Sequence, residues 1–190
     1  MPDVSLEIDR RRVRDQLAAA VREAGALALT TFRGQLKSWT KGKSSPVSEA
    51  DLAVDALLRE RLLAIHDAGW LSEETEDDPA RLGHSEIWAV DPIDGTRGYI
   101  AGSSDWGISA ALVGNGRPVI AALYAPVTDE LFLAVAGDGA TLNGARIEAS
   151  AGNDRAAISD EGGRNPPVRG AREIPARAVD GIDRPNLGLS

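Results

Sequence analysis

The stretch from Trp88 to Thr96, which reads WAVDPIDGT, carries two carboxylates three positions apart at the end of an apolar run. The run from Ile87 to Val90 predicts a short buried strand that ends on Asp91. Pro92 is expected to stop this strand, because proline has no N–H to donate to a sheet. Two carboxylates held there are costly unless something neutralises them. Mg²⁺ prefers oxygen ligands and usually shares them with a substrate phosphate, so Asp91 and Asp94 are candidate magnesium ligands.

Gly95 and Thr96 follow the second carboxylate and predict a turn that opens a helix. Backbone N–H groups at such a turn can bind an anion. The plainer alternative is that Asp91 and Asp94 only cap a turn, because Asp-Pro and Asp-Gly are common turn dipeptides.

The composition limits the classes of protein that fit. The 190 residues suit one domain or slightly more, and 43% hydrophobic residues are enough for a core. No apolar run is long enough to cross a membrane, and the polar start shows no secretory signal. The absence of cysteine excludes disulfides and thiolate metal sites, and it favours a cytoplasmic protein. A net charge of −8 argues against binding to duplex nucleic acid, and most of the acidic residues are expected to form a solvated surface.

The elements before the acidic stretch are predicted to be two helices and a paired-acid segment. Residues 8–32 predict an amphipathic helix, because apolar side chains recur at helical spacing. A loop over residues 39–51 leads into a second helix that runs to about His66, and Ser48 with Asp51 forms a capping-box-like start. A short apolar step then precedes Glu73 and Glu74.

The segment after the acidic stretch predicts an antiparallel meander. The β-rich runs 106–113, 118–125 and 130–136 are separated by turn sequences, of which Gly114-Asn115-Gly116 is the clearest. We expect these strands to continue the sheet that carries Asp91.

Three motifs together resemble the inositol monophosphatase superfamily of Mg²⁺-dependent, lithium-sensitive phosphatases. The segment DPIDGT resembles the signature of the superfamily. The segment KGKSSPVSEAD, from Lys41 to Asp51, resembles its first motif, and LSEE, from Leu71 to Glu74, resembles its paired-acid motif. The segment YAPV, from Tyr124 to Val127, is most similar to the CysQ-type 3′(2′),5′-bisphosphate nucleotidase branch.

The resemblance implies roles for individual residues. It implies that a metal is bound by the carboxylates of Glu73, Asp91 and Asp94 and by the backbone carbonyl of Ile93. It implies that Asp51, Glu73 and Thr96 hold or activate the attacking water. Substrate contacts would come from Asp94, Gly95, Thr96 and Lys41.

The resemblance also implies a fold, a layered α+β or α/β sandwich in which two N-terminal helices pack on a largely antiparallel sheet. It covers residues 8–147 and predicts a domain over residues 1–150. Residues 151–190 are rich in Gly, Pro, Arg and Asp and lack the family's W-D-x-A-A motif, whose Asp completes the metal cluster. We expect this tail to be irregular, either disordered or a remnant of a truncated or divergent C-terminal half.

The function expected from these observations is Mg²⁺-dependent hydrolysis of a small phosphorylated metabolite, with 3′-phosphoadenosine 5′-phosphate as the first choice. Inositol 1-phosphate and histidinol phosphate are the alternative substrates. The alternative function is a catalytically impaired remnant that binds metal or phosphate. No duplex nucleic acid or membrane is expected as a partner, whereas a homodimer is possible through an exposed sheet face.

Overall fold

The computed structural model describes residues 4–34, 37–41 and 45–149. The described residues up to Arg146 belong to one compact unit, and a second unit that begins at Ile147 is described only as far as Ala149. The predicted boundary at residue 150 and the predicted tail 151–190 lie outside the described residues.

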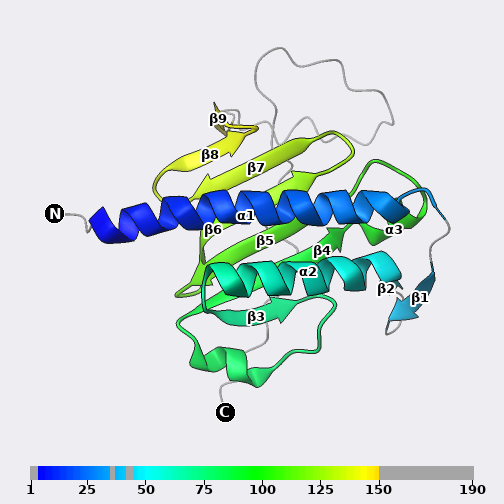
Figure 1. The fold of residues 1–190 in the computed structure, drawn as a ribbon, viewed down its shortest axis with the longest axis horizontal. Coiled ribbons are helices and arrows are strands. Elements are labelled where there is room, and N and C mark those ends of the chain that lie inside the picture. The colour runs from blue at the N-terminus through cyan, green and yellow to red at the C-terminus, as the bar shows by residue number, and fades with distance from the viewer. Residues whose placement is uncertain (1–3, 35–36, 42–44, 150–190) are drawn as a thin grey trace, which may run out of the picture. The chain divides into compact units, whose positions relative to one another are not determined.

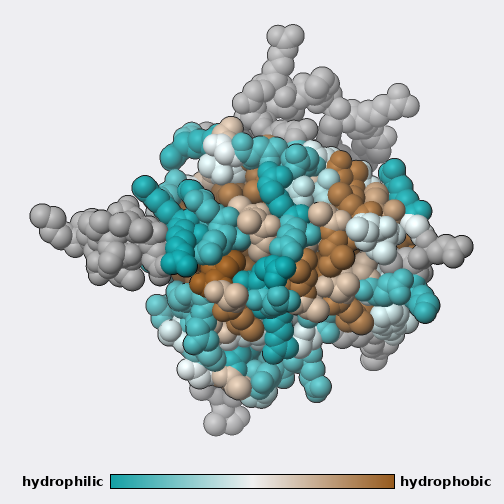
Figure 2. All heavy atoms as spheres, in the orientation of Figure 1, coloured by the Kyte–Doolittle hydropathy of each residue, from teal (hydrophilic) through white to brown (hydrophobic). Residues whose placement is uncertain are grey.

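Two long helices lie side by side over one face of the sheet (Figure 1). Helix α1 spans Val4–Thr31 and helix α2 spans Glu49–Ile65, which confirms the two helices expected from sequence. Among the described residues, no helix is long and apolar enough to cross a membrane. Figure 2 shows this helical face as a mixture of hydrophilic and hydrophobic side chains.

In the part of the chain that the structure describes, the main sheet has seven strands, and their spatial order follows the sequence. They are β3 (Gly69–Ser72), β4 (Glu86–Asp94), β5 (Gly107–Gly114), β6 (Arg117–Ala125), β7 (Glu130–Val135), β8 (Gly139–Leu142) and β9 (Ala145–Ile147). Strand β3 pairs parallel with β4, and each neighbouring pair from β4 to β8 is antiparallel. The predicted meander and the largely antiparallel sheet are therefore confirmed.

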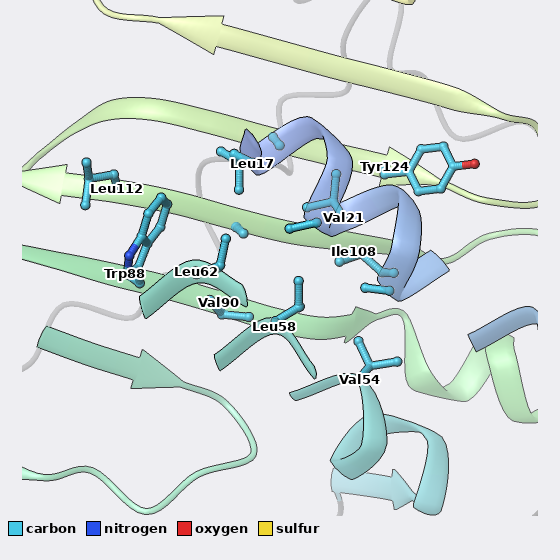
Figure 3. Close-up of a cluster of buried hydrophobic side chains, with 14 of the residues drawn as sticks. Leu17, Val21, Val54, Leu58, Leu62, Trp88, Val90, Ile108, Leu112 and Tyr124 are labelled. Atoms are coloured by element: carbon cyan, nitrogen blue, oxygen red, sulfur yellow. The ribbon is translucent and has the colours of Figure 1, made fainter. Parts of the chain in front are cut away.

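The core lies between the helices and the sheet, and it is formed by the apolar side of each helix and by alternate residues of the strands. Along β5 every second residue is buried, as expected when alternate side chains point to opposite faces of a sheet. Trp88 of β4 and Ile108 of β5 lie against Leu17 and Val21 of α1 and Leu58 of α2 (Figure 3). All five side chains are completely buried, so their packing fixes the position of the two helices on the sheet.

A short helix, α3 (Thr96–Ile100), follows the acidic stretch and is anchored to the end of α1. The Tyr99 hydroxyl donates to the Ala28 carbonyl at 2.6 Å, and the Tyr99 ring lies 4.8 Å from Trp106 and 5.4 Å from Phe32. Aromatic rings packed at these distances favour a fixed arrangement. The turn that contains Asp94 and Gly95 is therefore attached on both sides to rigid elements.

One prediction about the loops is wrong. The segment expected as a loop over residues 39–51 contains two short antiparallel strands, β1 (Ser38–Lys41) and β2 (Ser45–Ser48). Val47 is 2% exposed, and its burial helps to fix β2 against the start of α2. The chain also forms a 3₁₀ helix, η1 (Pro79–Gly83), between β3 and β4.

Candidate active site

The parallel pairing of β3 with β4 places Glu73 beside Asp91. Ser72 is the pairing partner of Val90, and the backbone N–H of Glu73 donates to the Val90 carbonyl at 3.3 Å. Glu73 therefore follows the last paired residue of β3 just as Asp91 follows its partner in β4. Their side chains are hydrogen-bonded to each other. Two acids that are 18 positions apart in sequence thus become neighbours at the ends of adjacent strands.

An irregularity in β4 changes the direction of the chain between the two aspartates. Asp91 pairs with Ser109 and Asp94 pairs with Gly107, so β4 uses one residue more than β5 over this interval. Pro92 lies inside the bulge, where its missing N–H costs no regular ladder bond. The prediction that Pro92 stops the strand is therefore wrong. The bulge buries Pro92 and Ile93 and leaves Asp94 exposed at the strand end.

The electrostatic surroundings of Asp91 strongly favour its neutral form. Burial raises the pKa of Asp91 to about 8, and the nearby negative charges of Glu73, Asp94 and Asp51 and the hydrogen bond with Glu73 act in the same direction. These acids therefore lie close enough to repel one another. A cation bound between them would have the opposite effect, because it favours the ionised carboxylates.

Asp51 lies in the first turn of α2 and is tied to the turn at the end of β4. The side chain is 1% exposed, and its Oδ2 accepts from the backbone N–H of Ser48 at 2.8 Å and from Ser48 Oγ at 2.5 Å. Its Oδ1 lies 3.1 Å from Thr96 Oγ1, which is also 2.9 Å from the Ile93 carbonyl oxygen. The predicted helix start at Ser48 and Asp51 is confirmed. The arrangement joins Asp51 and Thr96 directly.

Gly95 occupies a position that only glycine fits. Its φ is +90°, and a Cβ atom there would lie 2.6 Å from the backbone oxygen of Asp105. Gly95 is the residue before α3, so its amide and that of Thr96 belong to the first N–H groups of the helix, which have no partner within it. Their proposed contact with phosphate stays a prediction.

Lys41 ends β1 opposite Ser45, and its side chain lies outside the described part of the structure. Its predicted contact with substrate stays a prediction.

The donor set suits Mg²⁺. Every candidate ligand offers oxygen, from the carboxylates of Glu73, Asp91 and Asp94 and from the carbonyl of Ile93, and hard divalent cations prefer oxygen. Within the described ranges, no three His, Cys, Asp or Glu side chains form a ready-made metal cage. Mg²⁺ seldom needs one, because it keeps several waters and binds one or two carboxylates together with substrate phosphate. The close pair of Glu73 and Asp91, with Asp94 nearby, fits that mode.

Sequence reasoning missed a buried polar group behind Glu73, formed by Asp55, Ser72 and Thr75. A signal was present, because Asp55 follows Asp51 by four positions and lies on the same side of the helix as the apolar residues Val54 and Leu58. A charged residue at such a place needs buried partners.

Comparison with known proteins finds a matching family and relatives that are named as phosphatases. Residues 9–168 match the sequence profile of the inositol monophosphatase family. The chain is 37% identical over 139 residues to a histidinol-phosphatase of Chlorobaculum parvum, which covers 72% of this chain and 53% of the relative. It is 39% identical over 121 residues to an inositol-1-monophosphatase of Rhizobium meliloti, and the match covers 63% of this chain and 44% of the relative. It is 31% identical over 129 residues to the 3′(2′),5′-bisphosphate nucleotidase CysQ of Escherichia coli, and the match covers 65% of this chain and 52% of the relative.

A solved structure supports the same relationship. The structure of the extragenic suppressor protein suhB of Bartonella henselae is 31% identical in sequence and matches with a TM-score of 0.68. The match covers 73% of this chain and 54% of the suhB chain. The chain thus spans about half the length of the curated relatives it matches. Members of the matched family are metal-dependent phosphatases that hydrolyse phosphate monoesters. The profile match, the sequence relatives and the shared fold agree, and the chain belongs to the inositol monophosphatase family.

Proposed function

We propose that this chain is a Mg²⁺-dependent phosphatase that hydrolyses a small phosphate monoester. The observation that carries the proposal is the parallel register of β3 and β4, which brings Glu73 against Asp91. Asp94 and the hydrogen-bonded pair of Asp51 and Thr96 lie at the same end of β4. Packing alone does not require these acids together, and their mutual repulsion is relieved by a divalent cation.

Each residue has a proposed task in the reaction. Glu73, Asp91, Asp94 and the Ile93 carbonyl would hold Mg²⁺, which when bound neutralises charge on the phosphoryl oxygens and makes water a better nucleophile. The amides of Gly95 and Thr96 would bind phosphate oxygens, with Lys41 as a further proposed contact. Phosphoryl transfer depends mainly on such positioning and charge stabilisation.

Asp51 and Thr96 are proposed to orient the attacking water. When the Thr96 hydroxyl donates its hydrogen bond to Asp51, the lone pairs of Oγ1 can accept a hydrogen bond from water. Asp51 is held by two further hydrogen bonds from Ser48, so the Thr96 hydroxyl has a fixed acceptor. Glu73, which is exposed, is proposed to contact the same water.

The identity of the substrate is a second, more specific proposal. We propose 3′-phosphoadenosine 5′-phosphate, because the segment from Tyr124 to Val127 is similar to the CysQ branch. Relatives named for histidinol phosphate and inositol 1-phosphate share 37% and 39% identity, so these esters are the competing substrates. A cytoplasmic location is proposed from the absence of cysteine, and a homodimer also stays a prediction.

The alternative function is a protein that binds metal or phosphate without turnover. The acids Glu73, Asp91 and Asp94 can attract a cation whether or not the protein turns over a substrate.

The test is phosphate release from the three esters, with and without Mg²⁺. The variant Asp94→Asn removes a proposed ligand charge, and Asp138→Asn, in the exposed turn after β7, is the matched control. Release that requires Mg²⁺, survives in Asp138→Asn and is lost in Asp94→Asn would support the proposal. A folded protein that binds Mg²⁺ but releases no phosphate would support the alternative. Release that does not depend on Mg²⁺ or Asp94 would overturn the proposed site.

A further inference from the structure

We propose that Asp55 is a positioning residue that holds the Glu73 segment in place for cation binding, an inference that rests on the proposed function. Asp55 lies in the second turn of α2, one turn after Asp51, and is 7% exposed. A buried carboxylate is costly unless hydrogen-bond donors surround it. The donors of Asp55 come from the segment that carries Glu73.

The two oxygens of Asp55 bind residues on either side of Glu73. Oδ1 accepts a hydrogen bond from Ser72 Oγ, and Oδ2 accepts one from Thr75 Oγ1 at 2.6 Å. Ser72 Oγ in turn accepts the backbone N–H of Glu74 at 3.2 Å. Bonds to a charged acceptor are stronger than those between neutral groups. Asp55 therefore clamps the chain immediately before and shortly after Glu73.

The clamp matters because Glu73 lies at the end of its strand. The last pair in the register of β3 with β4 is Ser72 with Val90, and Glu73 adds one backbone bond of 3.3 Å beyond it. The Glu73 side chain is hydrogen-bonded to Asp91, so the position of the Glu73 backbone decides how close the two carboxylates can lie. Anchoring Ser72 and Thr75 to a rigid helix fixes this backbone and keeps the Glu73 carboxylate beside Asp91.

Helix α2 thereby serves two parts of the site. In its first turn, Asp51 contacts Thr96, and in the next turn, Asp55 contacts Ser72 and Thr75. Residues four apart on a helix lie on the same side, so one helix sets the distance between the water-orienting pair and the Glu73 segment.

A purely structural role for Asp55 makes a different prediction. Loss of either hydroxyl bond would then lower stability but leave the affinity for a cation unchanged in the folded protein. A positioning role predicts weaker cation binding even where the variant is fully folded. Groups that support metal ligands typically change metal affinity about ten- to hundredfold when removed.

The experiment measures Mn²⁺ binding by the loss of the free-ion signal in electron paramagnetic resonance. Mn²⁺ is a suitable probe because it also prefers carboxylate oxygen. Asp55→Asn and Thr75→Val, which removes only the hydroxyl of a similarly shaped side chain, are expected to weaken Mn²⁺ binding about ten- to hundredfold. Thr75→Ser keeps the hydroxyl and is expected to restore binding close to that of the wild type.

A stability control comes from the same helix. Leu62 is completely buried two turns after Asp55, and Leu62→Val is expected to lower the thermal midpoint without changing Mn²⁺ affinity. Equal Mn²⁺ affinity in Thr75→Val, Asp55→Asn and the wild type would overturn the proposal. A loss of affinity in Leu62→Val as large as that in Asp55→Asn would also overturn it, because the effect would then follow stability.

A readout without metal separates this inference from the proposed function. Amide hydrogen exchange in the metal-free protein is expected to be faster at Glu74 in Asp55→Asn than in the wild type, because Glu74 donates to Ser72 Oγ. If wild-type protein binds no Mn²⁺, the proposed function fails, and unchanged exchange at Glu74 would overturn the clamp itself. Faster exchange of the Glu74 amide in Asp55→Asn, but not in Leu62→Val, would support the clamp.

Discussion

At the scale of single residues, the acids of the candidate site differ because their surroundings differ. Asp51 is sealed from solvent and faces three hydrogen-bond contacts, from the Ser48 amide, the Ser48 hydroxyl and Thr96. Asp91 is half-buried among other acids, and burial with their negative charges raises its pKa to about 8. Burial and like charges oppose the ionised form of Asp91. Asp51 therefore has its hydrogen-bond partners within the protein, whereas a cation beside Asp91 would relieve the repulsion among the acids around it.

Replacement of Gly95 tests how tightly the turn at the end of β4 is built. Gly95→Ala places a Cβ atom 2.6 Å from the Asp105 carbonyl oxygen and forces φ of +90° on an L-residue. Gly116→Ala is the matched control, because Gly116 also has positive φ but no atom within 4 Å of the added Cβ.

We expect Gly116→Ala to lower the free energy of unfolding by about 1–2 kcal/mol, the cost of the left-handed conformation alone. Gly95→Ala is expected to cost at least about 1 kcal/mol more, because overpacking adds to that cost. Urea unfolding measures both variants. Equal losses would show that the contact with Asp105 does not constrain the turn.

Residue types and spacing were enough to make Asp91 and Asp94 candidate ligands, because both lie in a local turn pattern, whereas Asp51 became a candidate through the family resemblance. For Asp55 the sequence offered only its place on the apolar side of the helix, which does not identify its partners. Its partners Ser72 and Thr75 lie 17 and 20 positions away, and hydroxyl residues at those distances carry no local signal. Only the fold brings them together.

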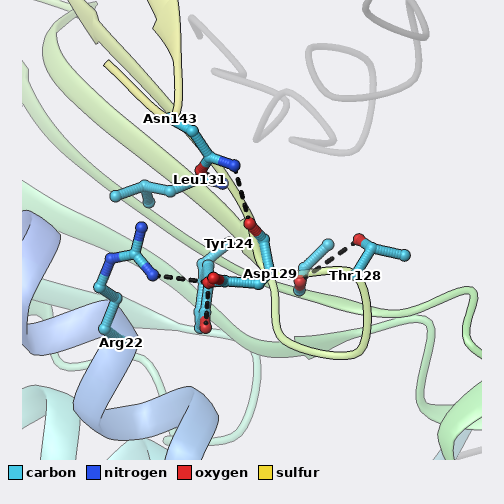
Figure 4. Close-up of polar contacts among 7 residues, drawn as sticks. Arg22, Tyr124, Thr128, Asp129, Leu131 and Asn143 are labelled. Carbon is cyan, nitrogen blue, oxygen red and sulfur yellow. Dashed lines mark hydrogen bonds and ion pairs between the residues drawn. The ribbon is translucent and has the colours of Figure 1, made fainter.

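At the scale of elements, helix α1 is fastened to the turn between β6 and β7. Arg22 of α1 forms an ion pair of 2.7 Å with Asp129, and the Tyr124 hydroxyl donates to the same carboxylate at 3.0 Å (Figure 4). The Arg22 guanidinium also lies 5.0 Å from the centre of the Tyr124 ring. The Asn143 side-chain amide donates to the Asp129 backbone oxygen at 2.9 Å. This bond connects the turn between β8 and β9 to the turn between β6 and β7.

This fastening predicts a dependence of stability on pH. The hydrogen bonds from Arg22 and Tyr124 hold the pKa of Asp129 below its ordinary value. The stabilisation is therefore present above the pKa of the unfolded chain and is lost as the pH falls through the lower pKa of the folded protein.

We expect the thermal midpoint of the wild type to exceed that of Asp129→Asn near pH 7, and the difference to shrink below about pH 4. Asn is a suitable replacement because Asp129 has φ of +50°, a conformation that Asn tolerates. A difference that stays constant from pH 7 to pH 3 would refute the assigned role of the carboxylate.

The elements were predictable where their signals are local. The periodicity of α1 and α2 and the turn residues between β5, β6 and β7 all lie within short windows of sequence. The parallel pairing of β3 with β4 was not predictable in this way, because the two strands are separated by a loop and η1. The bulge at Pro92 was missed because proline more often ends a strand than lies within one.

At the scale of the whole molecule, the described residues form the two layers predicted from sequence, with α1 and α2 over one face of the sheet (Figure 1). The family match extends over residues 9–168, and the chain spans about half the length of its curated relatives. The ligands proposed for Mg²⁺ come from β4 and from Glu73, the residue that follows β3. The account therefore predicts that this chain binds Mg²⁺ with its own residues.

Isothermal titration with Mg²⁺ tests the central claim, that Glu73 and Asp91 share a divalent cation. Wild-type protein and Asp138→Asn are expected to bind Mg²⁺ with equal affinity, because Asp138 lies outside the site. Glu73→Gln, which keeps the shape but not the charge of the side chain, is expected to bind at least about tenfold more weakly, since Mg²⁺ depends on few carboxylates. Equal binding by Glu73→Gln and the wild type, or no binding by folded wild-type protein, would contradict the account.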